Sequence, residues 1–60
     1  MITVTKMNER EIIINHRLIE MIETTPDTTI TMNTGKKIIV RDSLDEIMSR
    51  IAIYDKGAGK

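Results

Sequence analysis

The chain has 60 residues, with nine basic and nine acidic side chains, one histidine and no cysteine. A chain this short buries only about 60% of its unfolded surface, and its composition leaves no cysteine for a disulfide and few ligands for a metal centre. The balanced charge provides no overall field that would attract nucleic acid or an anionic membrane. We therefore expect one domain that gains stability by self-association, as a homo-oligomer.

The amino-acid composition favours strands. The chain has twelve isoleucines and eight threonines, and Tyr54 is its only aromatic residue. β-branched side chains pack well on a pleated sheet, so a mainly β domain is expected. No stretch reaches the roughly 20 apolar residues of a membrane span, and the first residues lack the basic and apolar regions of a secretion signal. We therefore expect a cytoplasmic protein without a membrane span.

Three strands are predicted in the first half of the chain. Ile2 and Val4 alternate with threonines within residues 1–7, a pattern typical of a strand with one buried face. Residues 11–15 form the second strand, which is apolar on both faces because three isoleucines follow one another. Residues 18–24 suit either one helical turn or, as we favour, a bulged third strand.

A hairpin is predicted in the second half of the chain. Pro26 and Asp27 favour a turn, after which residues 28–32 alternate as a fourth strand. Residues 33–35 form a three-residue loop whose glycine permits a positive φ. Residues 36–41 return as the fifth strand.

A C-terminal helix is predicted over residues 43–55. Ser43 and Glu46 have the spacing of a capping box, in which each side chain accepts a hydrogen bond from the other residue's backbone amide. Four apolar residues recur at helical spacing and would pack against one face of the sheet: Leu44, Ile47, Met48 and Ile51. Residues 57–60 are expected to be a flexible tail beyond a single domain of residues 1–56.

These elements predict an α+β fold of about five short antiparallel strands followed by one C-terminal amphipathic helix. The strands form either an open sheet or a small barrel of the SH3-like or Sm-like kind. No internal repeat, linker or low-complexity segment divides the chain.

The titratable residues give no sign of a catalytic or metal site. His16 lies between Asn15 and Arg17 with no nucleophile motif near it, which indicates a solvated loop histidine. Three carboxylates, Glu20, Glu23 and Asp27, are best explained as a charged rim that protects a sheet edge. We therefore predict that the chain is not an enzyme and has no catalytic, cofactor-binding or metal-binding residue.

Two isoleucines lie out of phase with the buried face of their strands. Ile13 and Ile39 alternate with neighbours that point inward, and one helix can cover only one side of a sheet. Because burying one isoleucine contributes about 1.5 to 3 kcal/mol, we expect a second copy or a partner to cover them. The candidate surface contains Ile13, Ile39, Thr29 and Thr31. The alternative is that each isoleucine is singly exposed, which is common on protein surfaces.

A small basic group gives a second interpretation of the binding surface. Lys36, Lys37 and Arg41 lie on one predicted strand and would meet phosphates if they were repeated around a ring. No aromatic residue is interleaved with them for base stacking. A small oligomeric nucleic-acid-binding regulator is therefore the alternative to a protein-binding module.

The chain combines a TPDT turn with an ITxxxGxK hairpin. Further features of its sequence are Asn8, the apolar triplet 12–14, Asn15, LIE at 18–20, IE at 22–23, TPDT at 25–28, Gly35-Lys36 and Ser43. With these features, most of the chain, from about residue 2 to residue 54, resembles the small flagellar FlbD family, which includes SwrD. The family often has glycine after the first asparagine, and this chain has Glu9 there, which indicates a different turn in the first hairpin.

The resemblance implies a protein encoded among flagellar genes that supports motor power and swarming. It implies no enzymatic activity and no cofactor. Its implied partners are flagellar motor or stator components, and its implied location is the periphery of the flagellar basal body. The family's known properties supply no functional residue for transfer to this chain.

Overall fold

The computed structural model describes residues 1–58 and contains two sheets and a long helix. The elements in chain order are β1 (Ile2–Thr5), β2 (Glu11–Ile14), the 3-10 helix η1 (His16–Leu18), β3 (Ile19–Glu23), β4 (Thr28–Met32), β5 (Lys37–Val40) and α1 (Leu44–Ala58). All pairs are antiparallel, in a two-stranded sheet β1–β2 and a three-stranded sheet β3–β4–β5. The predicted α+β fold is confirmed. The barrel alternative is wrong because, within residues 1–58, one isolated bridge between Lys6 and Val40 joins the two sheets.

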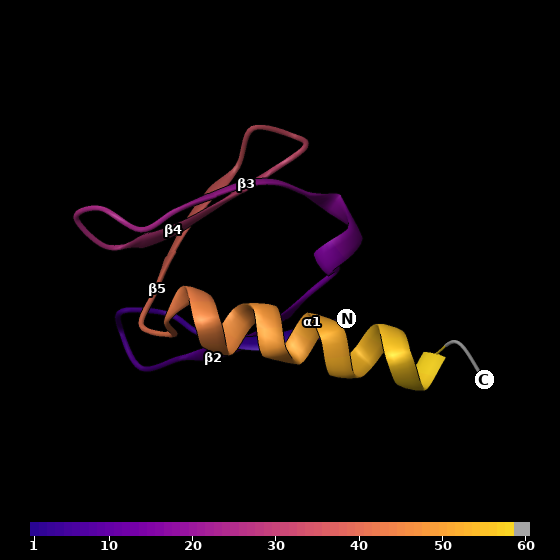
Figure 1. The fold of residues 1–60 in the computed structure, drawn as a ribbon. Helices are drawn as coiled ribbons and strands as arrows, with labels where there is room; N and C mark the ends of the chain where they lie inside the picture. Colours follow the sequence, from indigo (N-terminus) through magenta and orange to yellow (C-terminus); the bar gives the residue numbers. More distant parts are fainter. Residues whose placement is uncertain (59–60) are drawn as a thin grey trace.

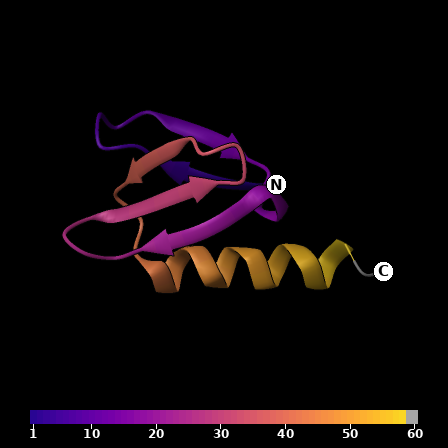
Figure 2. The same ribbon diagram turned by 90° about the horizontal axis from the view of Figure 1, so that it is seen from above.

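The elements form two layers (Figure 1). The three-stranded sheet is one layer, and the β1–β2 hairpin and α1 lie side by side in the other, with β1 nearer the helix (Figure 2). The side chains between the layers form the core, because alternate residues of every strand point inward. The buried members are Ile2, Val4, Ile14, Ile30, Ile38, Val40 and Ile47.

The two hairpin loops have the same backbone hydrogen bonds. In the first loop the Glu9 amide donates to the Lys6 carbonyl at 3.0 Å, and in the second the Gly35 amide donates to the Met32 carbonyl at 2.8 Å. Glu9 has φ 72° and Gly35 has φ 93°, so both loops end in a left-handed residue. The predicted glycine loop is confirmed. The expectation of a different first turn is wrong, because Glu9 adopts the conformation that glycine would adopt there.

The predicted third strand is present, and the alternative of one helical turn in residues 18–24 is wrong, because the short helix η1 ends at Leu18. η1 supplies a helical turn just before it, where the Asn15 side chain accepts a hydrogen bond from the Arg17 amide. β3 then pairs with β4, and its register shifts between Ile19 and Met21, which leaves Glu20 as a bulge. The preferred prediction of a bulged strand is confirmed. The turn from β3 to β4 contains a cis Thr25–Pro26 peptide bond.

The helix begins as predicted and ends later than predicted. The Ser43 amide donates to Glu46 Oε1 at 2.8 Å, and the Glu46 amide donates to Ser43 Oγ at 3.1 Å, which confirms the capping box. α1 continues to Ala58, so two residues of the expected tail 57–60 are helical and residues 59–60 lie outside the described residues.

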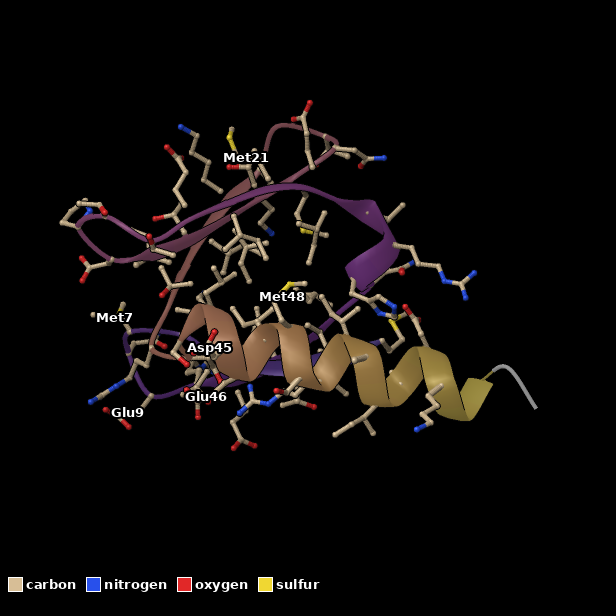
Figure 3. The ribbon with its side chains drawn as sticks, in the orientation of Figure 1. Met7, Glu9, Met21, Asp45, Glu46 and Met48 are labelled. Carbon is tan, nitrogen blue, oxygen red and sulfur yellow. The ribbon has the colours of Figure 1, made fainter. Side chains whose placement is uncertain are left out.

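The predicted apolar stripe of the helix is only partly buried. Ile47 is fully enclosed and Ile51 is half-buried, whereas Leu44 is exposed and Met48 has an exposed fraction of 52%. The reason is that α1 lies beside the hairpin and does not lie under the centre of the three-stranded sheet (Figure 2). Met48 points from α1 toward β3 (Figure 3). We call this side of the helix, with exposed Leu44 and Met48, the open side of α1.

Candidate interaction surfaces

The single histidine is buried, so its prediction as a solvated loop residue is wrong. His16 has an exposed fraction of 7%, and its Nε2 lies 2.9 Å from Asp55 Oδ1. Its Nδ1 lies 3.1 Å from the Met1 nitrogen, and the Tyr54 ring meets it edge-on. These contacts join the start of the chain, η1 and the second half of α1, so the imidazole serves the packing of the fold. Within residues 1–58, no group of three His, Asp or Glu side chains is arranged to hold a metal ion.

An ion pair between buried Asp42 and half-buried Arg50 closes the free edge of β1. Asp42 accepts a hydrogen bond from the Thr5 amide at 2.7 Å, and Arg50 donates to the Thr3 carbonyl at 2.9 Å. Arg50 also donates to Asp42, which is buried. Burial raises the pKa of the Asp42 carboxyl, but the hydrogen bonds from Thr5 and Arg50 outweigh this effect and hold the pKa below its usual value. This pair satisfies strand backbone groups and therefore has a structural role.

The outer surface of the three-stranded sheet brings together three of the predicted surface residues. Strand pairing forms two rows across it, Met21–Thr31–Lys37 and Glu23–Thr29–Ile39. We call these six residues the sheet face. Ile39 has an exposed fraction of 47%, and Met21 points away from α1 (Figure 3). Thr31 is buried among its neighbours, and its hydroxyl has no hydrogen-bond partner.

Ile13 lies elsewhere, so the predicted surface is divided. It pairs with Thr3 on the outer side of the β1–β2 hairpin and has an exposed fraction of 71%. Because the core lies between the hairpin and the three-stranded sheet, Ile13 and Ile39 point away from each other. Thr3 also lines a shallow hollow beside α1 with Ile53, whose exposed fraction is 72%. We call the surface formed by Met1, Thr3, Ile13, Ile53 and Tyr54 the hairpin face.

The sequence pattern alone did not indicate Met21 and Ile53. The bulge at Glu20 interrupts the alternation that would have placed Met21 on the face of Ile39. Ile53 lies six residues after Ile47, which places it off the buried side of the helix. A helical projection of the sequence would have placed Ile53 on the exposed side of the helix. The position of Met21 could be found only from the register between β3 and β4.

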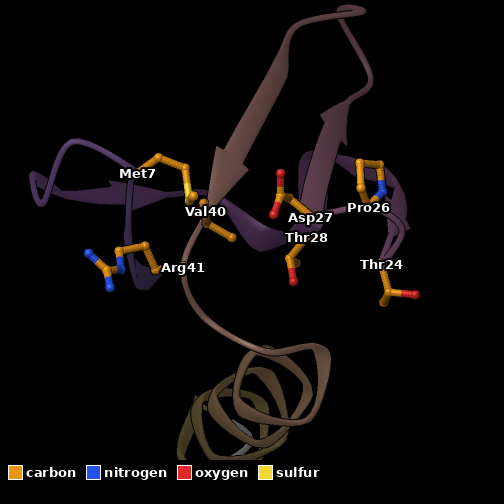
Figure 4. Close-up of a pocket in the computed structure, with 7 residues that line it drawn as sticks. All are labelled: Met7, Thr24, Pro26, Asp27, Thr28, Val40 and Arg41. Atoms are coloured by element: carbon orange, nitrogen blue, oxygen red, sulfur yellow. The ribbon is translucent and has the colours of Figure 1, made fainter.

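The predicted basic group is also divided. Lys36 and Lys37 line an open hollow with Lys6. Arg41 forms an ion pair with Glu9 and lines a different hollow with Met7, opposite Pro26 and Asp27 (Figure 4). The three residues predicted for phosphate binding therefore do not converge on one surface.

A family model described as "FlbD: Flagellar and Swarming motility proteins" matches residues 1–59. No curated protein and no solved structure matches the chain. In the part of the chain that the structure describes, no helix combines the length and the apolar character needed to span a bilayer.

Proposed function

This chain belongs to the FlbD family of flagellar and swarming motility proteins, and we propose that it supports flagellar motor power as a non-enzymatic accessory protein that binds another protein. The proposed partner is a component of the motor or its stator. The proposed location is the cytoplasmic side of the flagellar basal body, where such a component would be accessible.

The proposal rests on the number of large apolar side chains that are exposed at the surface. Seven hydrophobic residues are buried in the core, and ten large ones are exposed among the described residues. Single exposed apolar residues are ordinary, but here they gather on the sheet face, on the hairpin face and along the open side of α1. An apolar surface of this extent on so small a domain supports a role in binding.

The polar groups support a non-enzymatic role. His16 and Asp42 are the buried titratable side chains among the described residues, and both bond to other parts of the fold. A general acid or base needs access to a substrate proton in a cleft, and these two groups are occupied by internal partners. We therefore assign the function to surfaces and not to a reacting group.

We assign the motor partner to the hairpin face. Its two isoleucines, Ile13 and Ile53, are nearly three-quarters exposed. The hydrophobic gain from covering such side chains is available only when a partner binds, so this face can supply binding energy without changing the fold.

The test is a substitution of Ile13 in the bacterium that encodes this chain. Ile13→Asp places a charge on the hairpin face, and we expect lower torque in tethered cells and slower swarming at an unchanged protein level. Asn33→Asp adds the same charge at an exposed position in the second hairpin loop and is the matched control. Normal torque in the Ile13→Asp strain would contradict the assignment of this face, and normal torque after deletion of the gene would contradict the proposed function itself.

A further inference from the structure

We propose that the sheet face is self-complementary and docks on the sheet face of a second copy of this chain, with Glu23 of each copy paired to Lys37 of the other. This inference goes beyond the proposed function, because it concerns a different surface and a different partner. It also does not depend on the motor assignment.

The argument begins with the layout of the sheet face. Glu23 and Met21 are on the edge strand β3, and Lys37 and Ile39 are on the opposite edge strand β5. The acid and the base therefore occupy opposite corners of a rectangle, and the two apolar side chains occupy the other two corners. Among the described residues, neither Glu23 nor Lys37 takes part in a salt bridge. Both charges are exposed and available to a partner.

A dimer with two identical surfaces needs a two-fold axis, and face-to-face packing places this axis in the plane of the interface. An axis parallel to the strands would set Glu23 against Ile39, and an axis across the strands would set Glu23 against Met21. An axis along the Glu23–Lys37 diagonal would set each charge against its own copy. These three arrangements leave charges unpaired or repelling.

The fourth axis runs along the Met21–Ile39 diagonal and gives each of the four corner side chains a favourable partner. It brings Glu23 of each copy to Lys37 of the other, which gives two ion pairs. It also places Met21 on Met21 and Ile39 on Ile39, so that the apolar side chains are covered by their own copies. The arrangement of charges therefore selects one geometry and a second copy as the occupant.

The spacing of strands permits this geometry. Neighbouring strands are about 4.8 Å apart and residues two apart on a strand are separated by about 6.8 Å, so the face measures about 9.6 by 6.8 Å between Cα positions. Its diagonal then lies about 55° from the strands, and the strands of the two copies cross at about 70°, closer to the orthogonal class of sheet packing than to the aligned class. The backbones of Glu23 and of the opposing Lys37 are offset laterally by about 4 Å, which the long lysine side chain can span.

The size of the face sets the expected affinity. Standard interfaces contain about 20 to 30 residues a side, whereas the sheet face has six. We therefore expect reversible dimerisation with a dissociation constant in the micromolar range or weaker, detected by sedimentation equilibrium from about 10 μM to 1 mM.

Charge reversal with rescue is the first test. Glu23→Lys and Lys37→Glu should each raise the dimer dissociation constant about tenfold or more, because each change replaces two attractions by two repulsions. The double variant regenerates both pairs in exchanged positions and should restore the wild-type dissociation constant. Arg10→Glu, a charge reversal in the first hairpin loop, should leave it unchanged. A wild-type monomer at 1 mM, or a double variant as weak as the single ones, would overturn the proposal.

Cross-linking is the second test, and the absence of cysteine from the chain makes each introduced thiol unique. Facing sheets lie about 10 Å apart, so a bismaleimide of that span is the probe. Ile39→Cys lies on the axis and should cross-link to itself. Glu23→Cys or Lys37→Cys alone should not, but a mixture of these two variants should. Efficient self-cross-linking of Glu23→Cys, or none of Ile39→Cys, would overturn the geometry. Ile13→Asp should leave both results unchanged, so the failure of this inference and the failure of the motor assignment are separable.

Discussion

The first hairpin loop has a glutamate, Glu9, at a position whose backbone conformation favours glycine. The two hairpin loops share their hydrogen bonds, yet the left-handed position holds Gly35 in one and Glu9 in the other. A residue with a Cβ is disfavoured there by about 1 kcal/mol. We therefore expect Glu9→Gly to raise the free energy of unfolding by about 1 kcal/mol, measured by urea titration. The lost ion pair to Arg41 is exposed and contributes little.

The converse substitution in the second loop is the control. Gly35→Ala should lower the free energy of unfolding by a similar amount, although a Cβ at this position would meet no atom within 4 Å. The cost would then come from φ alone. Equal stabilities of the wild type and both variants would contradict this explanation of the loops.

A buried hydroxyl on the sheet face supports a second prediction at this scale. Thr31 Oγ1 is enclosed without a hydrogen-bond partner, and an unsatisfied buried polar group costs about 1 to 3 kcal/mol. Thr31→Val removes the hydroxyl at nearly constant shape, so we expect the free energy of unfolding to rise by about 1 kcal/mol. Thr29→Val on the same face is the matched control, because the Thr29 hydroxyl donates to the Asp27 carbonyl at 3.3 Å. A gain of equal size in both variants would mean that valine's strand propensity is the cause.

At the level of elements, the features that depend on local sequence are those that sequence reasoning predicted. The capping box of Ser43 and Glu46, the Gly35 loop and the bulged third strand each follow from residues within a few positions of one another. The burial of His16 depends on Asp55, 39 residues away. The exposure of Met48 depends on where the helix packs, which periodicity does not specify.

The candidate interaction surface also has one part that local sequence predicts and another part that it does not. The strand register placed Thr29, Thr31 and Ile39 together, and this register follows from the Gly35 loop. The separation of Ile13 from Ile39 depends on the packing of one sheet over the other, which alternation along a strand does not determine.

The Asp42–Arg50 pair joins β1 to α1, and its loss should affect both elements. Asp42→Asn keeps an oxygen for the Thr5 amide but leaves Arg50 without its buried counter-charge. We expect the free energy of unfolding at pH 7 to fall by about 2 kcal/mol, below the usual cost for a buried pair because Arg50 is partly exposed. Glu46→Gln is the control, since its oxygen retains the capping box while its weak contact with Arg50 at 4.0 Å is lost. An Asp42→Asn variant as stable as Glu46→Gln would show that the pair contributes nothing.

The same pair predicts a pH dependence. The pKa of Asp42 is lower in the folded protein than in the unfolded chain, so the unfolded state binds the proton more readily. The contribution of the ionised Asp42 carboxylate to stability is therefore complete above its pKa in the unfolded chain, about 4. This contribution is lost as the pH falls through the lower pKa of the folded protein. In urea titrations, the stability difference between wild type and Asp42→Asn should be constant from pH 7 to pH 5 and decrease below pH 4. A difference that grew on acidification would give the pKa shift the opposite sign.

At the scale of the whole molecule, the two layers present two surfaces that point in opposite directions. The sheet face and the hairpin face share no residue, so occupation of one leaves the other open. A dimer through the sheet faces would therefore display two hairpin faces on its outer sides. If the two hairpin faces bind two copies of a motor component that belong to one assembly, the second contact is intramolecular and apparent affinity rises without any new interaction.

The stability of the whole molecule depends on the contact between α1 and the two sheets. Ile47 is the helix's only side chain in the buried core of the described residues. Ile47→Ala removes about 2 to 5 kcal/mol by creating a cavity, and a core of this size supplies only about 3 to 5 kcal/mol. We therefore expect this variant to be largely unfolded at 37 °C, as measured by circular dichroism. Ile53→Ala changes the same residue type at an exposed position of the same helix, and its thermal midpoint should stay close to that of the wild type. Equal midpoints for the two variants would mean that the packing of the Ile47 side chain contributes little to the stability of the fold.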